Sequence, residues 1–240
     1  MKENRYRNEL KYVCSEAELA QIKNRIEHLL QRDYHVGEKD TYVIRSVYFD
    51  TYHNQYYYEN ENGYDKREKF RIRVYNADFS NIKLELKGKE NGLAWKDVCK
   101  ISEEQCRKML DGDELEISKS NPDLLNRFIL KMKTTGLRPV IIVEYDRLPY
   151  VYRTGNVRVT FDYNVRSGNR IEEFWKKNLL TRPVLSNGKH VLEVKYDAIF
   201  PDYIKNMIEV SDLQRTAFSK YYMCRKFTIG GNENDIFRRF

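Results

Sequence analysis

Residues 66–100 read KREKFRIRVYNADFSNIKLELKGKENGLAWKDVCK and contain the pattern that decides the fold. Apolar and charged residues alternate in residues 70–74 and again in residues 82–87, which predicts strands with one apolar and one ionic face. Arg71 and Arg73 concentrate positive charge on the ionic face. A charged face can simply be the solvated side of an antiparallel sheet, but this concentration of cations also suits a binding site for a polyanion.

The same alternation recurs outside this stretch. It predicts further strands at residues 7–13, 41–50, 139–147, 157–166 and 191–196, which makes eight strands with the three in residues 66–101. Helices are predicted at residues 15–30, 102–110, 121–132, 201–208 and 213–222, before a loosely ordered tail to Phe240. The first two helices begin with capping boxes, in which Ser15 is followed by Glu18 and Ser102 by Gln105.

The apolar faces of these strands need cover, and the amphipathic helices can supply it. If the helices pack on the outside of a curved sheet, the ionic faces converge on its inside, and closure of the sheet removes its edge strands. Because an unpaired charge is costly to remove from water, such an interior calls for water, carboxylates and a bound anion. We therefore predict an α+β fold in which an eight-stranded antiparallel sheet forms a tunnel, or barrel, with a charged lumen and helices packed outside.

Composition narrows the class of protein. The chain has 240 residues with no repeat and no linker, which predicts one domain over residues 1–240. Its 43 Lys and Arg exceed its 36 Asp and Glu, which favours an anionic partner. The absence of a long apolar run predicts a cytoplasmic protein without a transmembrane segment or signal peptide. The four cysteines and four histidines lack the spacing of a zinc site.

Seven short motifs occur in one order between residues 5 and 227: RNELKY, RSVYFDTYHNQYY, FRIRVY, LELKGK, VRVTFD, LEVKY and FSKYY. In this combination the chain resembles the VTC domain, the polyphosphate polymerase domain of the triphosphate tunnel superfamily, to which the CYTH phosphatases also belong. SVYFDT followed by RxR and LExK is more typical of VTC members. The resemblance implies an eight-stranded tunnel and a phosphotransferase that moves the terminal phosphoryl group of ATP onto inorganic polyphosphate with Mn²⁺ or Mg²⁺.

The resemblance also implies roles for individual residues. The phosphate-binding residues would be Lys11, Arg71, Arg73, Lys87, Lys100, Arg147, Arg158 and Lys220, and the metal ligand would be Glu193. Of these, the catalytic residues would be Lys11, Arg71, Arg73, Lys87, Arg158 and Glu193. Arginine can grip phosphate with two hydrogen bonds and lysine acts as a point charge. One departure is Ala217, three residues before Lys220, where fungal members have a second lysine; Arg215 is a possible substitute.

Two other functions stay open. A triphosphatase would use the same tunnel with water as the acceptor, although CYTH hydrolases typically begin with ExExK and residues 8–11 (NELK) hold only the second half. A noncatalytic domain that binds polyphosphate or nucleotide is less favoured, because Glu193 would weaken anion binding unless a metal sits there. The tyrosines at residues 56–58 could stack on bases but are better explained as half-buried packing residues, so no nucleic-acid partner is predicted. Fungal relatives act in a membrane complex, so a membrane partner is possible.

Overall fold

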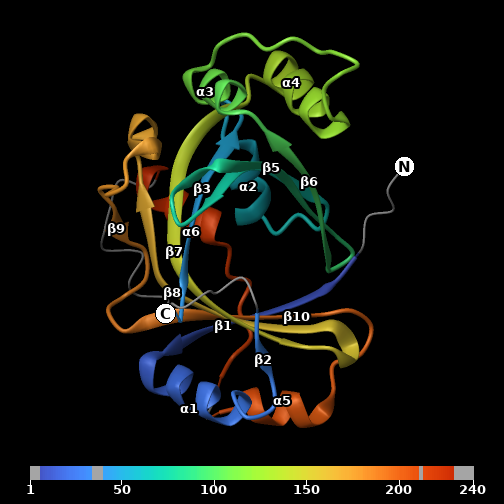
Figure 1. Ribbon diagram of the computed structural model, residues 1–240, viewed down its shortest axis with the longest axis vertical. Coiled ribbons are helices and arrows are strands. Elements are labelled where there is room, and N and C mark those ends of the chain that lie inside the picture. The colour runs from blue at the N-terminus through green and yellow to red at the C-terminus, as the bar shows by residue number, and fades with distance from the viewer. Residues whose placement is uncertain (1–5, 34–39, 211–212, 230–240) are drawn as a thin grey trace.

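The computed structural model describes residues 6–33, 40–210 and 213–229. The main strands are β1 (Asn8–Ser15), β3 (Tyr42–Asp50), β4 (Arg67–Tyr75), β5 (Asp78–Glu90), β6 (Leu93–Ile101), β7 (Arg138–Tyr152), β8 (Val157–Gly168) and β10 (Lys189–Tyr196). They form one antiparallel sheet in the order β1-β10-β8-β7-β3-β4-β5-β6 (Figure 1). Two short strands, β2 (Gln31–Arg32) and β9 (Arg182–Pro183), pair with β7 and β8. The structure thus confirms all eight predicted strands.

The helices are α1 (Glu16–Ile26), α2 (Gln55–Glu61), α3 (Glu103–Asp111), α4 (Asp123–Thr135), α5 (Asp202–Ile208) and α6 (Lys220–Ile229), with short 3-10 turns η2 (Thr154–Asn156) and η3 (Ile171–Trp175). Both predicted capping boxes are present: Ser15 Oγ accepts from the Glu18 amide at 3.3 Å, and Ser102 Oγ accepts from the Gln105 amide at 3.0 Å. Among the described residues, no helix is long and apolar enough to cross a membrane.

Two groups of helices cover the outer, apolar faces of the strands. Helices α1 and α5 lie together at one end of the molecule and α3 and α4 at the other (Figure 1). In the first group, Ile22 of α1 shares a buried cluster with Val159 of β8. In the second, the ring of Phe128 on α4 lies 4.8 Å from that of Phe49 on β3 and 5.2 Å from that of Phe70 on β4. The ionic faces are therefore left on the concave side, as predicted.

The curled sheet brings its two edge strands together at one end. The Arg7 amide donates to the carbonyl of Ala94 at 2.9 Å, and the Ala94 amide donates to the carbonyl of Arg7 at 3.0 Å. This bridge joins the start of β1 to β6, which lie at opposite ends of the strand order. Because the cross-strand partners of the sheet share a face, the side chains opposite one another on the concave side enclose a tunnel.

The predicted helix at residues 213–222 is wrong in its first part, which pairs with β1 instead, whereas residues 220–222 are helical. The Thr216 amide donates to the carbonyl of Lys11 at 2.8 Å, which holds this segment extended along the edge strand. Ser219 then starts α6, since its Oγ accepts from the Tyr222 amide at 3.3 Å. Residues 223–229, predicted as tail, continue this helix. The remaining predicted tail, residues 230–240, lies outside the described residues.

Helix α6 differs from the outer helices in packing against the concave side of the sheet. The ring of Tyr221 lies 5.2 Å from that of Tyr48, which pairs opposite Arg71 on the ionic face. The Tyr221 hydroxyl donates to the carboxylate of Asp50 at the end of β3. Burial is the main cause that raises the pKa of Tyr221, so this hydroxyl keeps its proton. The contact fixes α6 and the segment before it as one wall of the tunnel.

Candidate anion-binding site

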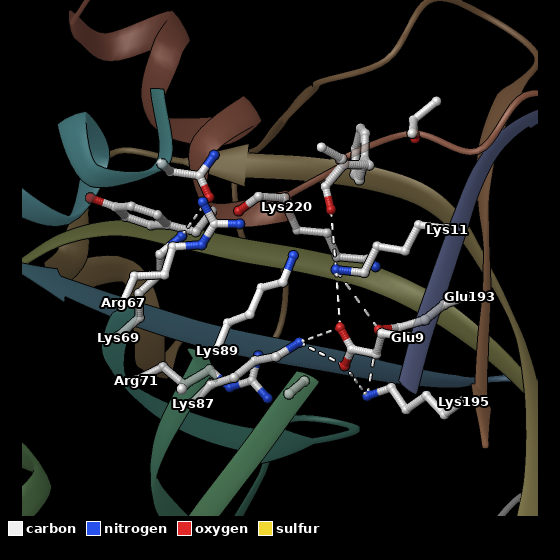
Figure 2. Close-up of a pocket in the computed structure, with 18 of the residues that line it drawn as sticks. Glu9, Lys11, Arg67, Lys69, Arg71, Lys87, Lys89, Glu193, Lys195 and Lys220 are labelled. Carbon is white, nitrogen blue, oxygen red and sulfur yellow. Dashed lines mark hydrogen bonds and ion pairs between the residues drawn. The ribbon is translucent and has the colours of Figure 1, made fainter. Parts of the chain in front are cut away.

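A cavity of about 450 Å³ lies on the concave side of the sheet. Its cationic lining residues are Lys11, Arg67, Lys69, Arg71, Arg73, Lys87, Lys89, Arg147, Lys195, Arg215 and Lys220, and its carboxylates are Glu9 and Glu193. Figure 2 shows that side chains from these separate strands and from α6 point toward one another into this space. Eleven cations against two carboxylates give the lining a large excess of positive charge.

Glu9 on β1 contacts three lysines of the cavity lining. Lys87 Nζ lies 2.8 Å and 3.0 Å from its two oxygens, Lys195 Nζ lies 2.9 Å from Oε1, and Lys11 Nζ lies 3.5 Å from Oε2. Burial alone would raise the pKa of Glu9, but the three ammonium groups together lower it well below its usual range. The carboxylate is therefore ionised at neutral pH and offsets part of the lysine charge.

Glu193 on β10 faces the same space. Its Oε1 lies 3.5 Å from Lys195 Nζ and 4.0 Å from Lys11 Nζ, and its Oε2 accepts from Arg147 at 3.1 Å. Burial acts to raise the pKa of Glu193, yet Lys195 and its other cationic neighbours hold that pKa well below the usual value. Lys195 Nζ thus stands between two ionised carboxylates, Glu9 and Glu193.

Two further carboxylates lie behind the lining and orient its arginines. Glu85 is fully buried and accepts from Arg71 Nε at 2.7 Å, while Arg71 Nη2 lies 2.5 Å from the same oxygen. Asp162 is also fully buried and accepts two hydrogen bonds from Arg147, at 2.6 Å and 2.7 Å. Lys220 Nζ lies 2.6 Å from Asp162. These pairs fix the direction in which each guanidinium faces the cavity.

One part of the lining has cations without carboxylates. Arg67 on β4 lies directly opposite Lys89 on β5, and Lys69 lies directly opposite Lys87. Within the described part of the chain, Arg67, Lys69 and Lys89 form no salt bridge, and neither does Arg215 (Figure 2 labels the first three). Like charges on opposite positions of neighbouring strands are destabilising. A bound anion would relieve this repulsion.

The structure brings most of the predicted site residues together. Lys11, Arg71, Arg73, Lys87, Arg147, Lys220 and Glu193 all line the cavity. Arg158 and Lys100 do not: Arg158 lies 2.9 Å from Asp33, and Lys100 is an exposed residue of β6 opposite Lys83. Their roles in phosphate binding stay predictions.

Sequence reasoning overlooked several cations of the lining. Arg67 and Lys69 continue the alternation of Arg71 and Arg73 on β4, and Lys89 continues that of Lys87 on β5. The alternation of side chains along these two strands was therefore a signal that could have identified Arg67, Lys69 and Lys89 in the sequence. Arg215, the possible substitute for the family lysine at Ala217, does line the cavity.

Lys87 links anion binding to pH. Burial, together with the charges of Lys11 and Lys195, lowers the pKa of Lys87 to about 7 despite the nearby Glu9. A bound polyphosphate would favour the ammonium form and raise this pKa, so the complex holds more protons than the free protein above pH 7. We expect tripolyphosphate binding to take up protons and the contribution of Lys87 to affinity to fall about five-fold between pH 7 and pH 8. Calorimetry in buffers of different ionisation enthalpy measures both.

Lys87→Arg is the matched control for this prediction. Arginine keeps the positive charge but does not titrate in this range, so the variant should lose the Lys87 share of the proton uptake. The ionisation of tripolyphosphate itself affects both proteins equally. Identical proton uptake by the variant and the original chain would show that Lys87 is already protonated in the free tunnel.

The fold and the site together define a tunnel protein with a cation-lined lumen. The family model of the VTC domain matches residues 6–229. The chain therefore belongs to the VTC domain family, which confirms the resemblance seen in its motifs.

Three solved structures match the chain at low sequence identity. A putative adenylyl cyclase from Hippeastrum, described as having a dominant triphosphatase activity, is 13% identical with a TM-score of 0.51, over 92% of this chain and 95% of that one. A putative adenylate cyclase from Bacillus halodurans is 13% identical with a TM-score of 0.48, over 85% and 86%. The PH1819 protein from Pyrococcus horikoshii OT3 is 15% identical with a TM-score of 0.46, over 88% and 95%. A sequence comparison with curated proteins finds no match.

Proposed function

We propose that this chain is a metal-dependent polyphosphate polymerase, which transfers the γ-phosphoryl group of ATP onto an inorganic polyphosphate chain inside the tunnel. The observation that carries the proposal is the cavity with eleven cationic side chains and two carboxylates. A ligand with one or two negative charges would leave most of that charge uncompensated, whereas a polyphosphate can offset it along its length. Membership of the VTC domain family supports the same activity.

Phosphoryl transfer needs positioning and charge neutralisation more than covalent help from the protein. Arg71 and Arg147 are held in place by Glu85 and Asp162, so their N–H groups meet an incoming phosphate without a large loss of side-chain freedom. Lys220 is held against Asp162 in the same way. These residues would bind nonbridging oxygens and hold the donor and acceptor phosphates in line.

The carboxylates of the lining fit a hard divalent cation. Glu9 and Glu193 are both ionised and both contact Lys195 Nζ, so a divalent cation that displaced this ammonium would find an oxygen from each. Within the described residues no group of three or more His, Cys, Asp and Glu side chains is arranged to hold a metal. Phosphate oxygens and water would therefore complete the shell of Mn²⁺ or Mg²⁺. The metal would supply further neutralisation of charge on the transferred phosphoryl group.

The deciding experiment incubates the purified chain with ATP and Mn²⁺. We expect a ladder of polyphosphate on a gel and its loss when the metal is chelated. Free orthophosphate without a polymer would contradict the proposal and identify a triphosphatase. Tight ATP binding without either product would identify a noncatalytic binding domain.

A further inference from the structure

Lys69 is a half-buried amine of the cavity lining to which the proposed phosphoryl transfer assigns no individual role. It lies on β4, directly opposite Lys87 on β5. Its Nζ donates to the amide oxygen of Asn60 on α2 at 2.9 Å and lies 4.9 Å from the ring centre of Tyr221 on α6. The Lys69 amine is therefore held in the cavity lining by its own strand β4 and by contacts with helices α2 and α6. Figure 2 shows its side chain in this lining.

No carboxylate forms a salt bridge with Lys69 within the described part of the chain. The carboxylate of Asp50 is taken by the Tyr221 hydroxyl and by the backbone amides of Tyr56 and Tyr57, at 2.9 Å and 3.1 Å. Contacts with a neutral amide oxygen and a ring face stabilise an ammonium less than an ion pair does. Lys69 therefore differs from Lys87, which is bound by both oxygens of Glu9.

The charges around Lys69 also favour its neutral form. Burial lowers the pKa of Lys69 well below its usual value, and the positive charges of Arg67, Lys11 and Lys87 lower it further. The negative charge of Asp50 acts to raise this pKa but does not reverse the shift. An ordinary exposed lysine is unprotonated in only about one molecule in a thousand at pH 7.4. An amine without its proton carries the lone pair that attacks a carbonyl carbon.

The same surroundings suit a ligand that carries phosphate. Arg67 and Lys89 face each other beside Lys69 without carboxylate partners, so both can bind phosphate oxygens. A small molecule held there by its phosphate would keep its remaining groups near the Lys69 amine. Such placement raises the effective concentration of a reactive group by orders of magnitude.

The Lys69 amine forms no salt bridge within the described residues and lies beside cations that can bind phosphate. We propose that Lys69 forms an imine with small phosphorylated aldehydes that enter the tunnel. The Nζ lone pair attacks the carbonyl carbon, the adduct loses one water molecule, and a C=N bond replaces C=O. The step needs no oxidant or reductant and reverses by hydrolysis. It would block the anion site reversibly. The inference rests on the anion cavity alone and does not depend on polymerase activity.

Pyridoxal 5′-phosphate is the probe for this inference. The protein is treated with it at neutral pH, the imine is trapped by borohydride reduction, and the modified peptide is identified by mass spectrometry. We expect one group per chain, mainly on Lys69. Tripolyphosphate should lower the labelling about ten-fold or more by competing for the cations, and pyridoxal without phosphate should label about ten-fold less.

Two variants test the assignment. Lys69→Arg keeps the charge but lacks the nucleophile, so labelling should fall about ten-fold or more. Lys89→Arg keeps the phosphate grip and should still be labelled at Lys69. Thermal unfolding shows whether each variant is folded, and the peptide map of the unchanged chain is decisive without either variant. Labelling mainly at Lys87, or spread over exposed lysines such as Lys131, would overturn the inference. So would equal labelling by pyridoxal and its phosphate.

Discussion

Replacing Glu193 with glutamine is expected to lower the turnover of ATP by about 100-fold or more, or about 2.7 kcal/mol in barrier height. Glutamine has nearly the same shape but keeps only one oxygen, so it can accept from Arg147 or from Lys195 but not from both, and it offers no negative oxygen to a hard cation. The substitution also removes a charge that repels triphosphate from the cavity. ATP should therefore bind at least as tightly without metal, while the gain in affinity on adding Mn²⁺ becomes smaller.

The measurement is ATP affinity with and without Mn²⁺, together with turnover, for the original chain and the variant. Glu103→Gln is the matched control, because it removes a negative charge at an exposed residue of α3 that does not line the cavity. Its metal dependence should match that of the original chain. If Glu193 only balances Arg147 and Lys195, Glu193→Gln will weaken the fold and leave the metal dependence of ATP binding unchanged. Near-normal turnover would likewise remove Glu193 from the metal site.

Most of the fold was predicted from strand parity, that is, from the alternation of side chains between the two faces of a strand. Alternation places Arg71 and Arg73 on one face, and the structure puts them on the concave side opposite Glu85 and Lys83. It works because a strand repeats every two residues whatever its partners are. The capping boxes at Ser15 and Ser102 succeeded for a similar reason, since their hydrogen bonds join neighbouring residues.

Features that depend on distant pairing could not be read from local patterns. The segment before α6 follows Lys11 of β1, more than 200 residues away, and that contact decides where the helix starts. Parity also tells which face a residue occupies but not its position along the tunnel. Lys96 and Lys100 share a face of β6 and neither lines the cavity, yet Lys96 contacts Glu85 at 3.0 Å while Lys100 lies opposite Lys83. For the same reason, the contact between Glu9 and Lys87 could not be predicted from the sequence.

Glu85→Gln is expected to lower the free energy of unfolding by about 3–5 kcal/mol, because it leaves buried cations without their counter-charge. Glu85 is fully buried, and it contacts Arg71, Arg73 at 3.8 Å and Lys96. Burial acts to raise the pKa of Glu85, but these cations hold it well below the usual value. Its stabilisation is therefore complete above the unfolded pKa of about 4.3 and is lost as pH falls through the folded pKa. The stability gap between the two proteins should narrow in acid.

Urea unfolding at pH 7 and at acidic pH measures this gap, and Glu103→Gln on α3 provides a control. Glu103 is half exposed and pairs with Arg107 one helical turn away, so its replacement should change stability by no more than about 0.5 kcal/mol.

Tripolyphosphate should bind Glu85→Gln more tightly and raise its melting temperature by more than it raises that of the original chain, because the freed cations become available to the anion. A loss below about 1 kcal/mol at pH 7 would contradict the prediction. Water entering the tunnel would then already compensate Arg71 and Arg73, and Glu85 would serve to orient them rather than to neutralise them.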